Sequence, residues 1–258
     1  MKDNNALRSI ITTYRKDIWK KFNEAINEFS LIEDNDVIGV CISGGKDSFL
    51  LSLCMEELRK YGKINFKIIN LLMDPGYDKK TLDNIKKNAK LLNINLTIFK
   101  TSIFDMIKNE KKPCYLCARK RRGALYSEAM RLGCNKIALG HHFNDVIETI
   151  IMSIIYNGKF KTMRPLLKSN NFENMTLIRP LYYVREESII RWMNFNKLNF
   201  INCACKVTKE DTSSRETVKN LIKYINSICT DADSNILTST KDVNLETLIS
   251  YRGKDKNE

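Results

Sequence analysis

The stretch Val37-Ile38-Gly39-Val40-Cys41-Ile42-Ser43-Gly44-Gly45-Lys46-Asp47-Ser48 decides the fold class of this chain. It starts as a short apolar run and then turns at Ser-Gly-Gly. After the turn, apolar residues return at helical spacing; they are Phe49, Leu50, Leu51, Leu53 and Leu58. The pattern predicts a strand, a glycine turn and a helix. Small residues at such a turn let backbone N–H groups approach an anion at the start of the helix.

The side chains of this turn have the chemistry of a nucleotide loop. Glycines allow backbone conformations that a side chain forbids. The lysine can neutralise phosphate charge, the serine hydroxyls can donate to phosphate oxygens, and the aspartate can help to hold magnesium. A tight turn without a ligand gives the lysine and the aspartate no packing reason to be there, and the first glycine of a Walker A loop is absent. The predicted nucleotide-binding residues of the loop are Ser43, Gly44, Gly45, Lys46, Asp47 and Ser48.

Further strands and helices alternate along the chain. Strands are expected at residues 66–73, 96–99 and 137–140, and helices at 6–29, 79–92, 146–155, 186–195 and 213–228. This order predicts an α/β fold with a parallel sheet and helices on both faces. We expect an N-terminal helical lead-in at 1–35, a nucleotide-binding domain with an inserted basic helix at 36–185, a helical C-terminal part at 186–230 and a polar tail at 231–258.

Parallel sheets bind ligands beyond the carboxyl ends of their strands, where a second polar turn is expected beside the first. Gly140-His141-His142-Phe143-Asn144-Asp145 ends one strand and starts a helix. Asp145 is a candidate for holding magnesium or organising phosphate, whereas Glu148 is explained by its place near a helix N-terminus. Either histidine is a ligand or base, or a hydrogen-bonded structural residue. Beside the loop, we expect Met73, Gly140 and His141 to contribute to nucleotide binding.

The composition is that of an ordinary globular protein, with 43% hydrophobic and 28% charged residues among 258. The net charge of +13 favours a polyanionic partner such as nucleic acid, although solvated lysine-rich surfaces would have the same effect. No stretch approaches the ~18 apolar residues of a membrane span, and the N-terminus lacks the apolar core of a signal peptide. We therefore expect a cytoplasmic protein without a membrane partner.

Eight cysteines in a cytosolic chain are better explained as metal or redox ligands where they cluster than as disulfides. Cys114-Tyr115-Leu116-Cys117 has a spacing that lets two thiolates bind one metal, and the basic residues that follow favour the thiolate form. Half a zinc site, a redox dithiol and part of an iron-sulfur site are all consistent with this pair. With Cys203 and Cys205, a four-cysteine structural zinc site remains an alternative. Ordinary thiols are expected at Cys41, Cys54, Cys134 and Cys229.

Basic residues surround the Cys-x-x-Cys pair. Because they adjoin the expected reaction centre, we expect some of them to bind RNA phosphates, although a charge run is usually a solvated face. Salt bridges are the alternative explanation for the two more distant arginines. The candidates for RNA binding are Arg119, Arg121, Arg122, Arg164 and Arg179.

Several of these stretches together resemble a known family. Ser43–Ser48 after an apolar strand looks like the PP-loop of the ATP pyrophosphatase superfamily, with its adenine nucleotide alpha hydrolase-like fold. Over residues 17–228 the sequence is similar to the tRNA 2-thiocytidine synthetase family, and more distantly to tRNA 2-thiouridine synthetases. The matching stretches are Ser43–Ser48, Asp74–Tyr77, Cys114–Tyr126, Gly140–Glu148 and Ile178–Leu181.

The resemblance implies an ATP-dependent tRNA sulfurtransferase that uses ATP, magnesium and a 4Fe-4S cluster. Three protein cysteines would hold the cluster, namely Cys114, Cys117 and one of Cys203 or Cys205, and the open iron would carry an exogenous sulfur. ATP would adenylate a ring carbonyl oxygen, sulfur would attack the activated carbon, and AMP and pyrophosphate would be released. The residues implied in catalysis are Asp47, Asp145, Cys114 and Cys117.

The implied partners are tRNA, a sulfur donor (a cysteine desulfurase or free sulfide) and a second copy of the chain in a homodimer. Cytidine is favoured as the target nucleoside. The chain departs from the family pattern at Asn144, where an aspartate is usual, and at Cys203-Ala204-Cys205, which leaves the third ligand open with Cys203 favoured. The alternatives are an adenylating enzyme for another nucleoside or a small molecule, and a zinc-stabilised nucleotide- or RNA-binding protein.

Overall fold

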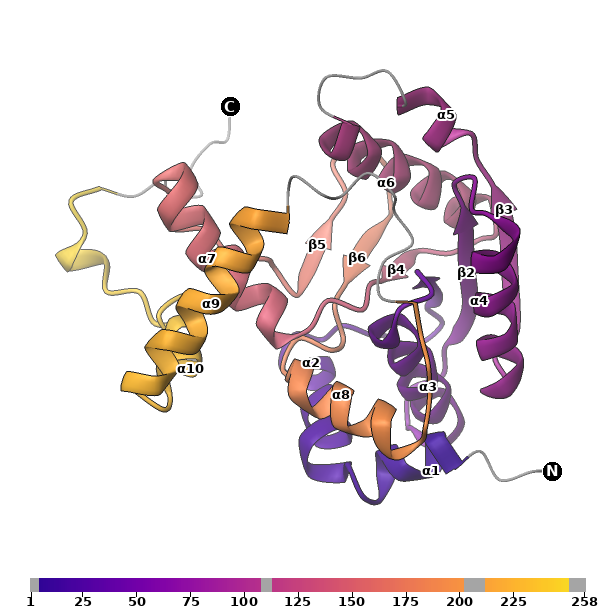
Figure 1. The fold of residues 1–258 in the computed structure, drawn as a ribbon, viewed down its shortest axis with the longest axis horizontal. Helices are drawn as coiled ribbons and strands as arrows, with labels where there is room; N and C mark the ends of the chain where they lie inside the picture. The colour runs from indigo at the N-terminus through magenta and orange to yellow at the C-terminus, as the bar shows by residue number, and fades with distance from the viewer. Residues whose placement is uncertain (1–4, 108–112, 202–211, 251–258) are drawn as a thin grey trace. The chain divides into compact units, whose positions relative to one another are not determined.

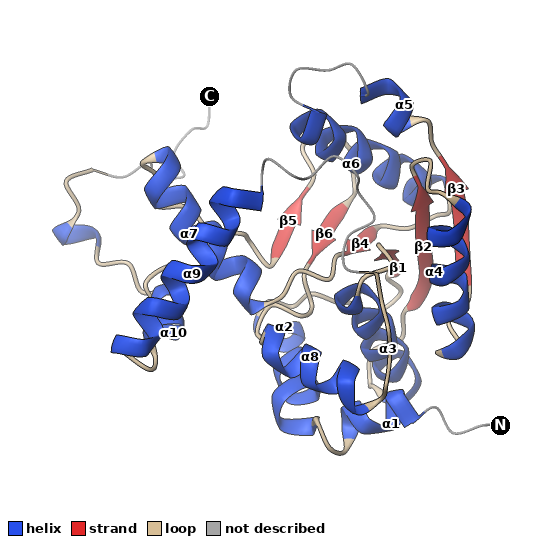
Figure 2. Ribbon diagram, in the orientation of Figure 1, coloured by secondary structure: helices blue, strands red, loops and turns tan. Residues whose placement is uncertain are grey.

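The computed structural model describes residues 5–107, 113–201 and 212–250. In this part of the chain the strands form one six-stranded sheet in the order β3-β2-β1-β4-β6-β5 (Figure 2). Only β5 is antiparallel, where it pairs with β6; the other pairings in the sheet are parallel. The strands are β1 (Val37–Ile42), β2 (Lys67–Asp74), β3 (Leu96–Lys100), β4 (Lys136–Ala138), β5 (Leu166–Lys168) and β6 (Thr176–Ile178). The predicted α/β class with a mostly parallel sheet is confirmed.

The helices follow the predicted order closely. Predicted helices at 79–92, 186–195 and 213–228 correspond to α4, α8 and α9. The helices are α1 (Asn5–Ile11), α2 (Lys20–Glu28), α3 (Lys46–Tyr61), α4 (Lys79–Leu91), α5 (Ile103–Ile107), α6 (Pro113–Arg131), α7 (Phe143–Asn157), α8 (Glu186–Phe195), α9 (Thr212–Ile228) and α10 (Ala232–Thr238). A π-helical turn, η1 (Arg15–Trp19), and a 3₁₀ turn, η2 (Leu245–Thr247), complete them.

The N-terminal segment is not the single helix that the sequence predicts over residues 6–29. It divides into α1, η1 and α2. At the break, the Thr12 hydroxyl donates a hydrogen bond of 2.8 Å to the carbonyl oxygen of Arg8. Such back-bonding competes with the regular helical pattern and often bends a helix. Ile10, Ile18 and Phe22 are all buried, so the apolar residues on both sides of the break still face the core.

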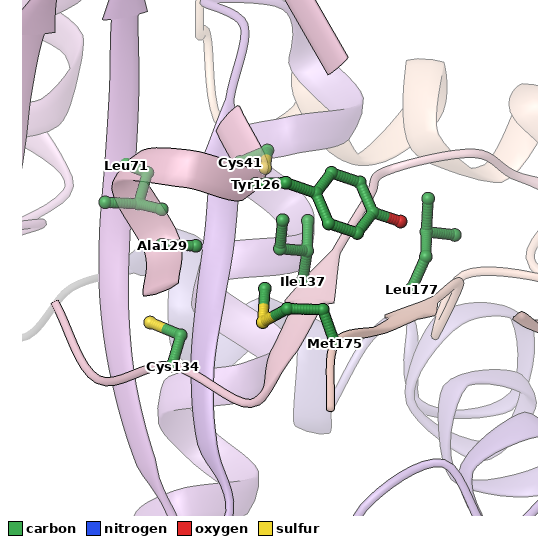
Figure 3. Packing of buried hydrophobic residues seen from close by; sticks show 8 residues of the cluster. All are labelled: Cys41, Leu71, Tyr126, Ala129, Cys134, Ile137, Met175 and Leu177. Atoms are coloured by element: carbon green, nitrogen blue, oxygen red, sulfur yellow. The ribbon is translucent and has the colours of Figure 1, made fainter. Parts of the chain in front are cut away.

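Helices cover both faces of the sheet (Figure 1). α3 packs against β1 and β2 on one face, together with α1 and α8, and α6 crosses β2 and β4 on the other. Successive residues of a strand point to opposite faces, so alternate residues of β1 face each helix. Under α6 the core consists of Cys41, Leu71, Tyr126, Ala129, Cys134, Ile137, Met175 and Leu177, which lie together in Figure 3.

The chain divides into two compact units, Met1–Asp145 with Arg164–Ser213, and Val146–Met163 with Ser214–Glu258. The domain boundaries expected from the sequence stay a prediction. In the second unit the Glu148 carboxylate is buried and pairs with Arg215 and Lys219 of α9. Residues 232–238, expected in a polar tail, form α10 with Ala232 and Leu237 buried. Among the described residues, none of the helices is both long and apolar enough to cross a membrane.

Candidate active site

Two polar turns meet at the carboxyl edge of the sheet. β1 and β4 are parallel neighbours with Val40 opposite Ala138, so the turns that follow them lie side by side. From β1 the chain continues to β2 and β3 on one side and later to β4 on the other. The turns therefore lie at a topological switch point, where open α/β sheets bind their ligands.

Gly140 permits this close approach. A Cβ atom at Gly140 would lie 3.0 Å from the carbonyl carbon of Asp47 and 3.1 Å from the backbone nitrogen of Ser48. Real Cβ contacts are rarely so short, and both contacts are to backbone of the first turn of α3. The two turns can thus approach this closely because residue 140 has no side chain.

The first turn, Ser43–Ser48, is called the nucleotide loop below. Gly44 has φ of +90°, which favours glycine, and a Cβ there would lie 2.8 Å from the Ile85 side chain. The Ser48 hydroxyl accepts from the backbone N–H of Ser43 at 3.2 Å and donates to the Gly45 carbonyl at 2.9 Å. In the described structure no side chain caps α3 at Gly45, so its first N–H groups suit an anion.

Charged groups of the loop are held in a partly buried network. Lys46 Nζ lies 3.2 Å from Asp47 Oδ1 and 3.0 Å from Glu186 Oε1. Burial opposes the charged form of Lys46, but the two carboxylates outweigh it and raise its pKa. Burial raises the pKa of Asp47 above its ordinary value, although His142 and Lys46 act in the opposite direction. An added cation beside Asp47 would therefore stabilise the charged form of this carboxylate.

A buried histidine lies between the two predicted catalytic aspartates. His142 Nε2 is 3.5 Å from Asp145 Oδ2 and 3.9 Å from Asp47 Oδ1. Asp145 also accepts the backbone N–H of His142 at 3.0 Å, which is a capping contact at the start of α7. Carboxylate oxygens are the ligands that Mg²⁺ prefers. The sequence did not single out His142 over His141, because adjacent residues at a strand end give no sign of which is buried.

A cavity of about 450 Å³ opens at this edge. Its lining includes nine predicted residues, most of them polar: Ser43, Asp47, Ser48, Met73, Arg121, Arg122, Gly140, His141 and Asp145. An apolar wall that the sequence did not predict is formed by Cys41, Ile42, Leu125, Tyr126, Ile137, Leu139 and Leu177. A mostly apolar cavity with converging polar groups is typical of a site for a small ligand.

The Cys-x-x-Cys pair starts the helix that lines this cavity. The backbone of α6 includes Cys114 and Cys117, one turn apart and hence on one face, and Arg121 follows a turn later. The side chains of these two cysteines lie outside the described part of the chain, as do Cys203 and Cys205 entirely. Ile201, the last described residue before that gap, donates its N–H to the Gly44 carbonyl at 3.4 Å. The chain therefore leaves the described structure beside the nucleotide loop.

The cysteines expected to be ordinary thiols are buried at Cys41, Cys54 and Cys134 and exposed at Cys229. Burial raises the pKa of Cys41 to about 12, and the neighbouring Cys134 adds to the effect. Although Cys41 lines the cavity, it is a protonated thiol at neutral pH, and the thiolate is the reactive form.

The predicted RNA-binding arginines differ in exposure. Arg119, Arg122 and Arg164 are exposed and Arg121 is half-buried. Arg179 is 8% exposed and donates to the carbonyl of Arg164. Burial lowers the pKa of Arg179 to about 10. Its burial makes Arg179 a support for neighbouring backbone rather than an open surface contact.

Comparison with known proteins shows the family of the chain. Residues 14–223 match the model of the PP-loop domain family. The chain is 34% identical over 233 residues to a tRNA-cytidine(32) 2-sulfurtransferase of Pelobacter propionicus, covering 89% of this chain and 86% of that protein. It is 36% identical over 212 residues to the Geotalea uraniireducens protein of that name, covering 81% and 84%.

A solved structure shares the fold. It is the U34-tRNA thiolase NcsA from Methanococcus maripaludis with its [4Fe-4S] cluster, at a TM-score of 0.70 and 20% identity. The match covers 89% of this chain and 78% of that chain. The predicted family and fold are confirmed by these comparisons. With a PP-loop domain over residues 14–223 and relatives that match along most of its length, the chain belongs to the tRNA-cytidine(32) 2-sulfurtransferase family of PP-loop proteins.

Proposed function

We propose that this chain is an ATP-dependent enzyme that transfers sulfur to the cytidine at position 32 of tRNA. The observation that carries the proposal is the meeting of the nucleotide loop with the turn at Gly140, beside a cavity lined by the helix that starts with Cys-x-x-Cys. The family of the chain supplies the substrate class. The names of the chain's relatives favour cytidine over the alternative nucleosides and small-molecule acceptors.

The nucleotide loop binds the phosphates of ATP in this proposal. Backbone N–H groups at the start of α3 and the two serine hydroxyls donate to phosphate oxygens, and Lys46 contributes positive charge. Asp47 and Asp145 hold magnesium, which offsets the cost of burying the Asp47 charge. Met73, Gly140 and His141 line the part of the cavity that receives the rest of the nucleotide.

A 4Fe-4S cluster fits the donors that the chain offers. Two cysteines one turn apart on α6 precede an arginine-rich turn, and the chain enters the segment with Cys203 and Cys205 beside the nucleotide loop. We propose Cys114, Cys117 and one of Cys203 or Cys205 as its ligands. When bound, the cluster supplies an open coordination position for sulfur. The chain's own residues orient the activated base toward it and keep water away through the apolar wall of the cavity.

Arginines of α6, together with Arg164, bind the RNA in this proposal. Arg119, Arg121 and Arg122 follow the cysteine pair on α6, and Arg164 is presented by the backbone that Arg179 supports. Phosphate contacts of this kind position an RNA without reading its sequence. The proposal includes a homodimer, a sulfur donor that is a cysteine desulfurase or free sulfide, and a cytoplasmic location.

The test is anaerobic purification with iron and sulfide analysis, followed by mass spectrometry of tRNA nucleosides. We expect about four irons per chain and 2-thiocytidine in tRNA incubated with ATP, magnesium and sulfide. Colourless protein with one zinc contradicts the cluster, and tRNA without thiocytidine contradicts the function. Comparison of Cys203→Ala with Cys205→Ala identifies the third ligand by loss of iron.

A further inference from the structure

The Lys46 ammonium is held from two directions. Asp47, its neighbour in the loop, contributes one carboxylate, and Glu186 contributes the other at 3.0 Å from 140 residues further along the chain. The Lys46 and Glu186 side chains are 21% and 22% exposed, so solvent only partly screens their attraction. The contact joins the nucleotide loop to the first residue of α8.

Glu186 is itself fixed by the second turn of the site. Its backbone N–H donates to Asn144 Oδ1 at 2.9 Å, and Asn144 Nδ2 donates to Glu187 Oε1 at 3.4 Å. Phe143, which precedes Asn144, makes a further hydrogen bond between the two segments, because its N–H donates to the Val184 carbonyl at 3.0 Å. Asn144 directly precedes Asp145, so the start of α8 is connected to both turns of the site.

The amide at Asn144 suits this place better than a carboxylate. An amide side chain has both an acceptor and donors, and here it uses one of each. An aspartate would keep the acceptor for the Glu186 N–H, but it would place a second negative charge beside Glu187. Asparagine in place of the usual aspartate at residue 144 therefore avoids repulsion from Glu186 and Glu187, the two consecutive glutamates of α8.

We propose that Glu186, fixed by Asn144, is a positioning residue for Lys46 in the reaction with ATP. The inference rests on the proposed function in assigning Lys46 to the phosphates. An ammonium has three donors, so Lys46 can keep Glu186 and still bind a phosphate oxygen. The ion pair removes the conformational freedom of a long side chain before the nucleotide arrives. Glu186 also adds negative charge near the phosphates. For the affinity for ATP, the gain from an oriented Lys46 and the repulsion by this charge therefore oppose each other. For turnover, the orientation of Lys46 is the dominant effect.

The experiment compares Glu186→Gln with wild type in the full, anaerobically purified chain. Turnover is pyrophosphate release in the presence of tRNA, and affinity is calorimetric binding of a non-hydrolysable ATP analogue with magnesium. We expect turnover to fall about tenfold, while the dissociation constant stays within about threefold or decreases. Glu186→Asp keeps the charge and should restore part of the turnover. Asn144→Ala should also lower turnover, by less than Glu186→Gln does, with little change in the dissociation constant of the ATP analogue.

Glu187→Gln is the matched control, since its carboxylate lies in the same turn but contacts Asn144 rather than Lys46. It should behave as wild type. A second readout is independent of the reaction: the ¹⁵Nζ signal of Lys46 should be resolved in wild type and Glu187→Gln and lost in Glu186→Gln.

Unchanged turnover in Glu186→Gln overturns the inference, as does a joint loss of affinity and thermal stability, which indicates a merely structural role. If wild type does not act on tRNA, the proposed function fails. The NMR comparison then still decides whether Glu186 fixes Lys46.

Discussion

Gly140 lies so close to Asp47 that one added Cβ would come within 3.0 Å of the Asp47 carbonyl carbon. The added Cβ would meet backbone atoms, so movement of a flexible side chain cannot relieve the contact. The spacing of the two turns, and with it the position of the Asp47 carboxylate relative to Asp145, depends on the absence of a side chain at residue 140.

Gly140→Ala should therefore weaken nucleotide binding. The loop must move by a few tenths of an ångström, and we expect about tenfold weaker binding of an ATP analogue, with a loss of about 1–3 kcal/mol in unfolding free energy from overpacking. Gly123→Ala in α6 is the control, because a Cβ at Gly123 meets nothing within 4 Å. Calorimetry and chemical denaturation measure both quantities. Equal affinity in Gly140→Ala would show that the close approach does not matter.

Asp47→Asn should separate stability from activity. Burial raises the pKa of Asp47 in the folded protein, so its ionisation costs stability, and this cost is absent below the ordinary value of 3.8 and fully present above the folded pKa. The variant should melt at a higher temperature than wild type at pH 7, and the difference should shrink as the pH falls. Turnover should fall about 100-fold or more, because a magnesium ligand is lost. A variant that is less stable at pH 7 contradicts the assigned cause.

The pH profile of wild-type turnover follows from the same carboxylate. Because Asp47 must be ionised to hold magnesium, activity should decline on the acid side at a pH above the ordinary value for an aspartate. Raising the magnesium concentration should move this decline to lower pH, since metal binding competes with the proton. A decline that does not respond to magnesium would assign it to another group.

Cys41→Ala should leave sulfur transfer nearly intact. The thiol lines the cavity, but its pKa of about 12 keeps it protonated at neutral pH. We expect activity within about threefold of wild type and a stability loss of about 1 kcal/mol from the missing buried sulfur. Cys114→Ala is the comparison and should lose both iron and activity. Loss of transfer in Cys41→Ala with the iron retained would make Cys41 a sulfur carrier and contradict this assignment.

Lys136→Met should destabilise the fold strongly. The Lys136 ammonium is 2.8 Å from Asp36 Oδ2, and these side chains are 7% and 3% exposed. Removing the cation leaves a buried carboxylate, which costs about 3–5 kcal/mol in unfolding free energy. Arg131→Met, which breaks a surface pair with Glu128, is the control and should change stability little. Urea denaturation of both variants measures the difference.

The sequence predicts those elements whose pattern extends over several turns or alternations. α4 and α8 have clear apolar faces and agree with prediction to within a residue. β5 and β6 were not predicted, because a three-residue strand is too short to show alternation. The first predicted helix is divided after Ile11, where the Thr12 hydroxyl donates to the Arg8 carbonyl, and apolar spacing does not reveal this bond.

For the site, the local motifs and the meeting of the two turns could be predicted, whereas individual side-chain contacts between distant segments could not. The loop residues follow from a single strand-turn-helix pattern, and the meeting of the two turns follows from a parallel sheet. Glu186 was missed, since an acid in the first turn of a helix has an ordinary explanation and its partner Lys46 is remote in sequence. Arg179 was a candidate for RNA binding or a salt bridge, and the sequence does not show that its guanidinium donates to the backbone carbonyl of Arg164.

Lys136 begins β4, and Gly140 follows two residues after its end. At the first position a buried charge is fully paired, whereas at the second the chain omits a side chain so that a poorly compensated carboxylate can be placed beside it. The residue at the start of β4 thus contributes to the stability of the fold, and the glycine just after its end contributes to the geometry of the site. Substitutions near Lys136 could therefore raise the stability of the protein without changing the site. Substitutions at Gly140 would change the site and would require a protein stable enough to tolerate the lost free energy of unfolding.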